Sequence, residues 1–247
     1  MAGGRLLGPR QPGSGVPHAV ADERIGCMPH KFVDRTEAGR ELATALAPRY
    51  AGRADVVVLG LPRGGVPVAY ELAIALEAPL DVFVVRKLVL AGQEEFGIGA
   101  VATGGVRVVD ESVLRAYGVD AETLEAITQR ERLELDRRER LYRDDRPPPA
   151  LAGRIVILVD DGLATGSTMR AAVAALRAEG PRAIVIAVPV GAGETCEAMA
   201  HLVDDIVCLE TPDPFYAVGL WYENFDQTDD QEVHDLLERA AARHAIR

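Results

Sequence analysis

The sequence predicts an α/β fold, a doubly wound parallel sheet covered by helices on both faces. Two observations carry this prediction. Apolar residues form short continuous runs instead of alternating with polar ones, as in strands buried on both faces of a parallel sheet, and helical stretches separate the runs. The chain has 247 residues, of which 48% are hydrophobic. This length and composition fit one large domain, or a domain with an appended subdomain.

A tail, a helix and then alternating strands and helices make up the predicted chain. Residues 1–27 carry glycine and proline without a periodic apolar pattern, so we expect a disordered tail, or a natural start at Met28. Apolar residues at helical spacing predict a helix over 34–47, with Asp34 as N-cap and Pro48 ending it. The remaining predicted elements are a strand at 56–59, a turn at 60–65, a helix at 66–76, a strand at 82–85, a strand at 155–159, a helix at 167–179, and strands at 184–188 and 206–209.

Two segments interrupt the alternation. Residues 88–105 are rich in glycine and lack a periodic apolar pattern, which predicts a long mobile loop or a loop with a short hairpin. Loops of this length in compact domains are often functional. Residues 120–143 predict a charged, solvated helix packed by one apolar stripe, and the prolines at 147–149 end it.

Charge, hydropathy and cysteine usage exclude several classes of protein. Lys and Arg number 27 against 38 Asp and Glu, so the net charge of −11 argues against a protein that coats nucleic acid or an anionic membrane. No apolar run approaches the roughly 20 residues of a membrane-spanning helix, and no signal peptide is evident, so we expect a soluble, cytoplasmic protein. Cys27, Cys196 and Cys208 form no C-x-x-C pair, which favours reduced thiols over disulfides or a zinc site.

One segment, residues 155–168, combines the features of a sugar phosphate site. Asp160 and Asp161 follow an apolar strand, at the edge of a parallel sheet where ligands bind. Residues 164–168 (Ala-Thr-Gly-Ser-Thr) then offer backbone N–H groups, hydroxyls and the N-terminus of a helix, which suit a phosphate monoester. The paired carboxylates suit vicinal hydroxyls, or a divalent ion held through water. Together these features predict a site for a ribose 5-phosphate.

Other interpretations of these residues account for less of the pattern. A Walker B strand also ends in acids, but no glycine-rich loop here ends in Gly-Lys-Ser/Thr. Residues 97–102 match G-x-G-x-x-A of dinucleotide-binding proteins, yet Thr-Gly-Gly follows where a helix should begin. An acid pair that only caps a helix leaves the Thr-Gly-Ser-Thr continuation unexplained.

The stretch from Asp160 to Thr168 resembles the signature of the type I phosphoribosyltransferases, in which two acids precede T-G-x-T. The resemblance covers about 32–238, and is strongest to an uncharacterised bacterial group with Arg-Gly-Gly and Ala-Val-Gly-x-Trp-Tyr segments. It implies a phosphoribosyltransferase domain over 28–247 that adds a small C-terminal hood at about 190–228 to the parallel sheet. It also implies that the acid pair is catalytic and holds the ribose hydroxyls of phosphoribosyl pyrophosphate with Mg²⁺. The implied 5-phosphate ligands are Ala164, Thr165, Gly166, Ser167 and Thr168.

The same resemblance implies a pyrophosphate site on two further segments. Residues 61–67 match the family's pyrophosphate loop, which often has an unusual peptide bond; Gly64 and Gly65 would permit that conformation, and Arg63 would add charge. A tight turn with a surface arginine is the alternative. Arg86 and Lys87 end the predicted second strand, where a basic residue of the family meets the pyrophosphate, and Lys87 is the candidate catalytic cation. An ordinary strand-end cation is the alternative there.

A lid and a base site complete the implied site. Residues 88–105 occupy the position of the family's flexible catalytic loop, which excludes water from an oxocarbenium-like transition state. Glu94 and Glu95 on that loop would approach the sugar or the base, or are solvated acids. In the hood, one or two aromatic side chains would stack on the base, while core packing accounts equally well for most of them. The hood aromatics are Phe215, Tyr216, Trp221, Tyr222 and Phe225.

The implied activity is transfer of the 5-phosphoribosyl group from phosphoribosyl pyrophosphate to a nitrogenous base, a step of nucleotide salvage. Ala164 stands where the hypoxanthine-guanine branch has a third Asp, which argues against 6-oxopurines and leaves the base open. The alternative function is a non-catalytic regulator that binds phosphoribosyl pyrophosphate on the same fold. The expected partners are these small molecules and, in the case of a homodimer, a second copy of the chain.

Overall fold

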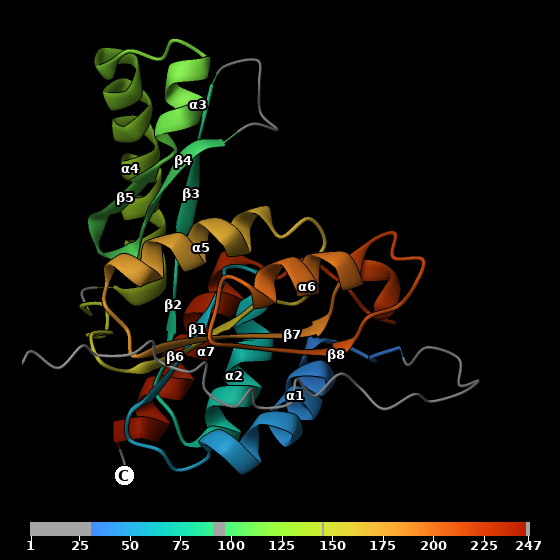
Figure 1. Cartoon of the computed structure of the whole chain (residues 1–247). Coiled ribbons are helices and arrows are strands. Elements are labelled where there is room, and N and C mark those ends of the chain that lie inside the picture. The colour runs from blue at the N-terminus through green and yellow to red at the C-terminus, as the bar shows by residue number, and fades with distance from the viewer. Residues whose placement is uncertain (1–30, 91–96, 145, 246–247) are drawn as a thin grey trace, which may run out of the picture.

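The central element of the structure is a five-stranded parallel sheet. The structure is a computed structural model, and it describes residues 31–90, 97–144 and 146–245. The strands run in the order β2-β1-β6-β7-β8 (Figure 1). The prediction of a parallel α/β sheet is thereby confirmed. The strand bounds are Val56–Gly60 (β1), Leu80–Val82 (β2), Ile155–Val159 (β6), Ala183–Val190 (β7) and Asp205–Glu210 (β8).

Helices cover both faces of this sheet. Helices α1 (Arg35–Tyr50) and α2 (Gly65–Leu76) lie on one face, and α5 (Ser167–Ala178) and α6 (Gly193–Ala200) on the other (Figure 1). Side chains of a strand alternate between the two layers: Val56 packs in the core under α1 and α2, and Val57 packs in the core under α5 and α6. Burial on both faces explains why the strands read as continuous apolar runs.

The first helix begins as predicted but runs past its proline. Asp34 caps α1, because its Oδ1 accepts a hydrogen bond from the Glu37 N–H at 2.8 Å. The helix does not end at Pro48, and extends to Tyr50. A proline in the last turn removes one hydrogen bond only, and the Ala51 N–H still closes the turn on the Ala47 carbonyl at 3.1 Å.

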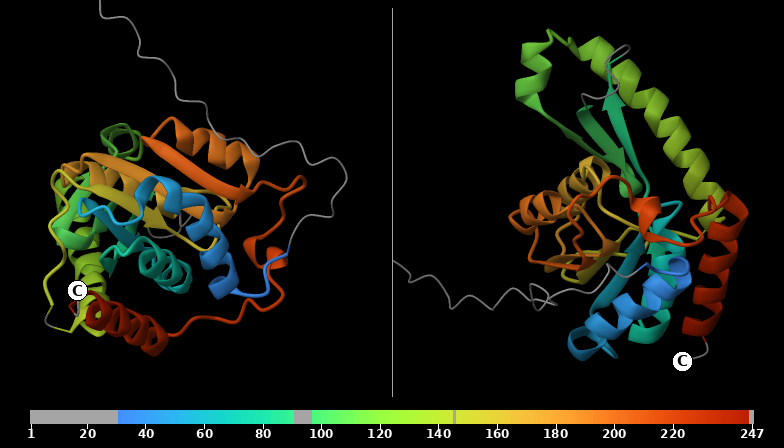
Figure 2. Two further views of the ribbon diagram at one scale, coloured as in Figure 1. Left: turned by 90° about the horizontal axis from the view of Figure 1, so that it is seen from below. Right: turned by 90° about the vertical axis from the view of Figure 1, so that its right-hand side faces the viewer.

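A second, antiparallel sheet forms an arm that projects from the core (Figures 1 and 2). It comprises β3 (Val85–Val89), β4 (Gly97–Ala102) and β5 (Val106–Val109), with a 3₁₀ turn η1 (Thr103–Gly105) between the last two. Helices α3 (Glu111–Ala116) and α4 (Ala121–Arg143) complete the arm. The described parts of segment 88–105 therefore match the hairpin alternative, and not a loop without secondary structure. Its mobility stays a prediction.

The predicted strand at 82–85 is wrong, because the chain changes sheets there. Strand β2 ends at Val82 and β3 begins at Val85. In between, the Phe83 N–H still donates to the Gly60 carbonyl of β1 at 3.0 Å, whereas the Val84 carbonyl already accepts from the Thr103 N–H at 2.9 Å. Two side chains take further backbone groups: Arg143 Nη2 donates to the Val82 carbonyl at 2.6 Å, and the Val84 N–H donates to Thr103 Oγ1 at 2.9 Å. The apolar run therefore divides between two sheets.

The C-terminal region differs from the predicted hood in extent. Helix α6 and strand β8 fall within 190–228, yet they belong to the central sheet and its helical layer. The irregular segment 211–229, which includes the 3₁₀ turn η2 (Val218–Trp221), corresponds to the hood. Helix α7 (Asp230–Ala245) then packs against α2 and α4 around Tyr142 and Val233.

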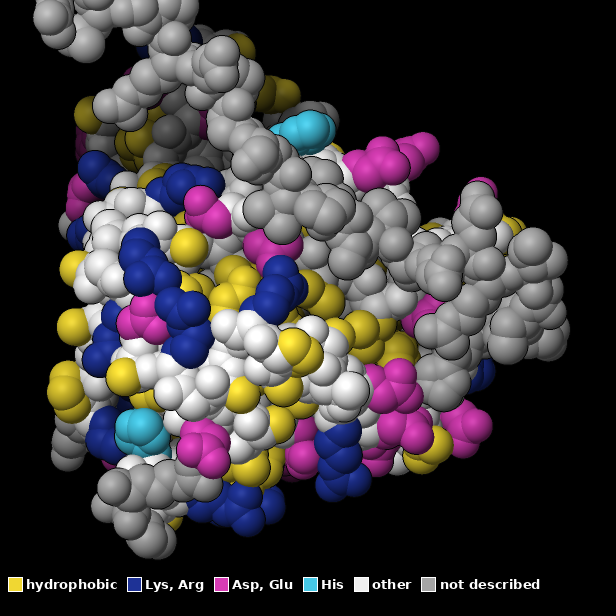
Figure 3. Space-filling model, turned by 60° about the horizontal axis from the view of Figure 1, so that its bottom comes forward, with side chains coloured by type: hydrophobic (Ala, Val, Ile, Leu, Met, Phe, Trp, Pro, Cys, Tyr) yellow, Lys and Arg dark blue, Asp and Glu magenta, His cyan; other side chains and the backbone are white. Residues whose placement is uncertain are grey.

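Three features of the described residues relate to the composition: the surface charge, the hydropathy of the helices and the state of the cysteines. On the face drawn in Figure 3, Lys and Arg side chains are interspersed with Asp and Glu, without a continuous basic stripe. Among the described residues, no helix has both the length and the apolar character needed to cross a membrane. Cys196 and Cys208 are free thiols, and Cys27 lies outside the described residues.

Candidate functional site

Two acidic side chains lie together at the carboxyl end of β6. Asp160 Oδ1 accepts a hydrogen bond from the Asp161 N–H at 2.9 Å, and both residues are largely withdrawn from water. Burial, and secondarily the charge of Asp161, raises the pKa of Asp160 well above its usual value. Burial also raises the pKa of Asp161, although an arginine opposes this shift. The site thus holds two neighbouring carboxyl groups, and a bound cation would neutralise their negative charge.

That arginine is Arg35, which the sequence analysis missed. Its Nε donates to Asp161 Oδ2 at 2.8 Å, its Nη2 lies 2.8 Å from the same oxygen, and its side chain is 12% exposed. Arg35 is the first residue of α1, where the helix dipole disfavours a positive charge. A basic residue directly after an Asp N-cap was therefore the signal in the sequence that could have indicated a partner elsewhere.

The two glycines of the predicted pyrophosphate loop pack directly against the acid pair. A Cβ on Gly64 would overlap Asp161 Oδ2, and a Cβ on Gly65 would lie 2.6 Å from the Val159 carbonyl oxygen and 2.8 Å from Asp160 Cα. The Pro62–Arg63 peptide bond is cis. The loop thus contains the unusual peptide bond that the resemblance implied, and neither glycine has a positive φ. They are needed because the loop and β6 approach too closely for side chains.

The predicted 5-phosphate loop leads into α5 beside the acid pair. Gly166 adopts φ +70°, which favours glycine, and a Cβ there would lie 2.8 Å from Thr195 Cγ2. The Thr195 hydroxyl donates to the Ala164 carbonyl at 2.7 Å and fixes the loop. Gly166 has no side chain to cap α5, and the Ser167 N–H makes a long hydrogen bond of 3.5 Å to Thr165 Oγ1. The first turn of the helix therefore has N–H groups without an intrahelical partner. The remaining loop side chains are exposed, namely Ala164, Thr165, Ser167 and Thr168.

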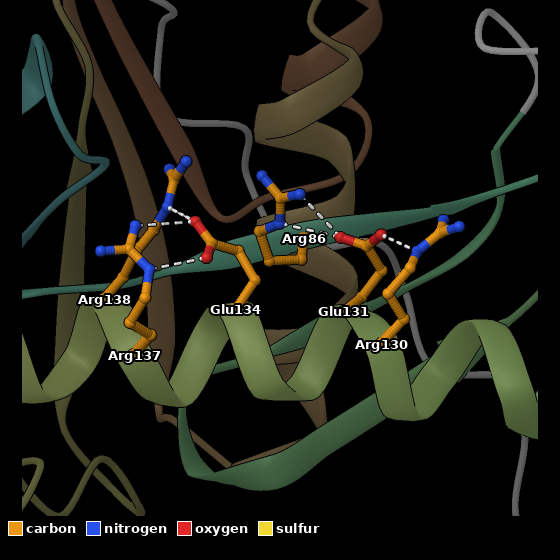
Figure 4. Close-up of polar contacts among 6 residues, drawn as sticks. All are labelled: Arg86, Arg130, Glu131, Glu134, Arg137 and Arg138. Atoms are coloured by element: carbon orange, nitrogen blue, oxygen red, sulfur yellow. Dashed lines mark hydrogen bonds and ion pairs between the residues drawn. The ribbon is translucent and has the colours of Figure 1, made fainter.

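Lys87 and Arg86 lie on opposite faces of β3, because neighbouring side chains of a strand alternate. Lys87 Nζ donates to Ser167 Oγ at 2.6 Å, so the arm brings this lysine to the start of α5. Arg86 points to α4, where its Nε and Nη2 donate to Glu131 Oε2 at 2.9 and 2.7 Å (Figure 4). The structure thus brings Lys87 to the predicted site and pairs Arg86 elsewhere. Neither residue ends a strand of the parallel sheet, contrary to the prediction.

The arginines around α4 are largely paired with acids. Arg86 and Arg130 flank Glu131, while Arg137 and Arg138 flank Glu134 (Figure 4). Hydrogen bonds from its two arginines lower the pKa of Glu134 to about 2. The Arg86–Glu131 pair attaches β3 to α4 and uses the Arg86 charge for structure, whereas the other pairs lie within α4.

Arg63 lies at the rim of the site with a loose partner. Its Nη1 is 3.9 Å from Asp230 Oδ1, and a third of its side chain is exposed. Asp230 is committed more closely to Tyr142, whose hydroxyl donates to the same oxygen at 2.7 Å. Arg63 therefore remains available to an anion near the pyrophosphate loop.

The C-terminal segment covers the acid pair with aromatic residues. The Tyr222 hydroxyl donates to the Asp161 carbonyl at 2.6 Å, and its ring centroid is 5.6 Å from Phe32 and 5.0 Å from Phe225. Tyr222 is buried, whereas Phe225 is 37% exposed. Trp221 Nε1 is buried without a hydrogen-bond partner among the described residues. The buried Tyr222 therefore has a structural role, because its hydroxyl attaches the C-terminal segment to Asp161. Stacking of hood aromatics on a base stays a prediction.

Two other parts of the predicted or potential site lie elsewhere. Glu94 and Glu95 fall outside the described residues.

Asp144, His234 and Glu238 place potential metal-ligand atoms within 4.8 Å of one another near the end of α4. His234 Nε2 lies 2.9 Å from Asp144 Oδ2, and Arg146 Nη2 lies 3.5 Å from Glu238 Oε1. Ion pairs account for this group, which we assign to the packing of α7 on α4.

The arrangement of strands and the placement of the acid pair at the end of β6 define the fold class of the type I phosphoribosyltransferases. The chain belongs to the phosphoribosyl transferase domain family, whose model matches residues 34–223. It is similar to a crystal structure of TT1426 from Thermus thermophilus, with a TM-score of 0.77 and 44% identity over 85% of this chain and 98% of that one.

Curated relatives extend this similarity. Two Mycobacterium tuberculosis proteins, provisionally named phosphoribosyl transferases, are 49% identical over 209 residues, which is 85% of this chain and 47% of theirs. The chain thus spans about half the length of these relatives. The bifunctional protein PyrR of Streptomyces coelicolor is 31% identical over 153 residues, 62% of this chain and 61% of that protein.

Proposed function

We propose that this protein transfers the 5-phosphoribosyl group of phosphoribosyl pyrophosphate to a nitrogenous base and releases pyrophosphate. One observation carries the proposal: the Lys87–Ser167 hydrogen bond, 2.6 Å long, joins the arm to the start of α5, next to the acid pair at the end of β6. Carboxylates, an uncapped helix N-terminus and a cation then meet at one edge of the sheet, where parallel sheets bind ligands. We place this activity in the cytoplasm, as a step of nucleotide salvage.

The proposed roles follow the chemistry of each group. The N–H groups and hydroxyls of residues 165–168 bind the 5-phosphate, and Lys87 neutralises charge beside it. Asp160 and Asp161 accept hydrogen bonds from the ribose hydroxyls and stabilise positive charge that develops on the sugar ring. Arg63 and the N–H groups around Gly64 hold the pyrophosphate. Arg86 has no part in this proposal, because Glu131 holds it on the other face of β3.

The acid pair also fits a magnesium ion. Mg²⁺ prefers hard oxygen ligands, keeps several waters and is commonly bound by one or two carboxylates together with substrate phosphates. Asp160 and Asp161 supply that donor set beside a loop whose glycines leave no side chain between it and the carboxylates. When bound, the ion would neutralise the pyrophosphate as it leaves.

Release of pyrophosphate from phosphoribosyl pyrophosphate and Mg²⁺ across a panel of nucleobases tests the proposal. The panel includes adenine, uracil and hypoxanthine, because Ala164 argues against 6-oxopurines. We expect release with at least one base, abolished by the double substitution Asp160→Asn and Asp161→Asn. The matched control is the pair Asp204→Asn and Asp205→Asn, two adjacent acids at the opposite end of the sheet, at the start of β8. Full activity of the first double variant would refute the assignment.

The second candidate function is a regulator that binds the same ligand without turnover. It gives a different outcome in the same experiment. Binding of phosphoribosyl pyrophosphate without release of pyrophosphate for any base would favour the regulator over the transferase.

A further inference from the structure

Arg35 connects three parts of the molecule that are distant in sequence. It belongs to α1, it pairs with Asp161 after β6, and its Nη1 donates to the Asp226 carbonyl at 2.7 Å. Its guanidinium carbon also lies 4.0 Å from the centroid of the Phe225 ring, a cation–π arrangement. The side chain is 12% exposed, with its bond to Asp161 partly buried and its bond to Asp226 at the surface. These contacts with Asp161, Asp226 and Phe225 hold it in one orientation.

The pair fixes how the Asp161 carboxylate is presented. Two of the three guanidinium nitrogens of Arg35, Nε and Nη2, contact Oδ2 of Asp161. The guanidinium therefore leaves Oδ1 of Asp161 to other ligands. Among the described residues, three neighbours are hydrogen-bonded to Asp161: Arg35 from α1, Asp160 beside it in the chain, and Tyr222 from the C-terminal segment. Arg35 is the cationic neighbour of these three, so its charge-assisted hydrogen bonds set the orientation of the Asp161 carboxylate.

The C-terminal segment is attached to Asp161 twice. Residues 222–226 contact Asp161 directly through the Tyr222 hydroxyl on its carbonyl, 2.6 Å, and indirectly through Arg35. The same segment is anchored to the start of α1, because the Glu223 N–H donates to the Phe32 carbonyl at 2.8 Å and the Asn224 N–H to the Val33 carbonyl at 2.9 Å. A ligand that displaces Phe225 would consequently move the guanidinium that orients Asp161.

We propose that Arg35 is a positioning residue that couples residues 222–226 to the acid pair, so that a ligand seated on this segment changes how Asp161 is presented to the ribose. The proposal rests on the proposed function of the acid pair. Arg35 acts through Asp161 and through Phe225, and does not itself touch the reacting atoms. Such a link would make sugar binding and occupancy of the C-terminal segment depend on each other.

Calorimetric titration with phosphoribosyl pyrophosphate and Mg²⁺ at pH 7 tests the proposal. We expect Arg35→Met to weaken binding about tenfold, the equivalent of one charge-assisted contact, because Asp161 loses the group that orients its carboxylate. Arg35→Lys restores the charge and should recover most of the affinity. Phe225→Leu should weaken binding less than Arg35→Met. The matched control is Arg49→Met, which removes another α1 arginine from an aspartate, Asp205.

Unchanged affinity of Arg35→Met would overturn the proposal. A merely structural role for Arg35 would lower the affinity without being relieved by lysine, and this result would overturn it as well. Should the wild-type protein not bind phosphoribosyl pyrophosphate, the proposed function fails. The coupling is then read from urea unfolding of Arg35→Met, Asp161→Asn and the double variant. Non-additive midpoints would preserve the Arg35–Asp161 link, and additive midpoints would remove it.

Discussion

The predicted pyrophosphate loop, residues 61–67, lies so close to the acid pair that Gly65→Ala should destabilise the protein. The added Cβ would lie 2.6 Å from the Val159 carbonyl oxygen and 2.8 Å from Asp160 Cα. Both are backbone atoms of the buried sheet edge, so a side-chain rotation cannot relieve the overlap. Overpacking of this kind costs about 1–3 kcal/mol, while alanine in a helix gains roughly 0.5–1 kcal/mol over glycine. The expected net loss is about 1–2 kcal/mol.

Gly193→Ala is the matched control for this variant. Gly65 opens α2 and Gly193 opens α6, so both substitutions change helix propensity at the same position of a helix. A Cβ on Gly193 would meet nothing within 4 Å, so that variant should be as stable as the wild type or slightly more so. Urea denaturation followed by circular dichroism compares the two. Equal midpoints for Gly65→Ala and Gly193→Ala would refute the described packing of the loop on β6.

Three further predictions concern buried or paired charges. Burial raises the pKa of Asp160, so the native state holds a proton that the unfolded chain releases, and the free energy of unfolding falls as pH rises above about 4. Asp160→Asn should therefore stabilise the ligand-free protein by about 1 kcal/mol at pH 7 and by less near pH 4, and coincident urea midpoints at both pH values would contradict this. Arg143→Met should cost about 3–5 kcal/mol, because it leaves Asp81, 2.7 Å away, buried without its cation; a midpoint near that of the wild type would show the pair to be dispensable. The hydrogen bond that the His234 ring donates to the Asp144 carboxylate raises the pKa of His234, so Asp144→Asn should lower that pKa toward its usual value in an NMR titration, and an unmoved titration curve would argue against the pairing.

The central sheet and the acid pair could be predicted because each depends on local pattern. Continuous apolar runs indicated strands buried on both faces, and Asp160 to Thr168 contain both halves of the predicted sugar phosphate site within one strand-loop-helix unit. The position of the glycines at 64 and 65 was also predictable, but their reason was not. It depends on the distance to β6, which only the folded chain defines.

The arm could not be predicted, because its boundary is set by side chains from distant elements. Arg143 and Thr103 take the backbone groups of Val82 and Val84, and this divides one apolar run between two sheets. This division also affects the candidate site, because the residue at which β3 begins determines which face of the strand Arg86 and Lys87 each occupy. Lys87 goes to Ser167 and Arg86 goes to Glu131, a division that two adjacent basic residues in a sequence do not reveal.

Calorimetric binding of phosphoribosyl pyrophosphate, with and without Mg²⁺, tests the central claim most directly. The site described here predicts stoichiometric binding to the wild-type chain that strengthens with Mg²⁺ and is lost in the Asp160→Asn, Asp161→Asn double variant. Asp204→Asn with Asp205→Asn should bind as the wild type does. Binding that survives loss of the Asp160–Asp161 pair, or no binding to the folded wild-type protein, would contradict the claim that this acid pair is a phosphoribosyl pyrophosphate site.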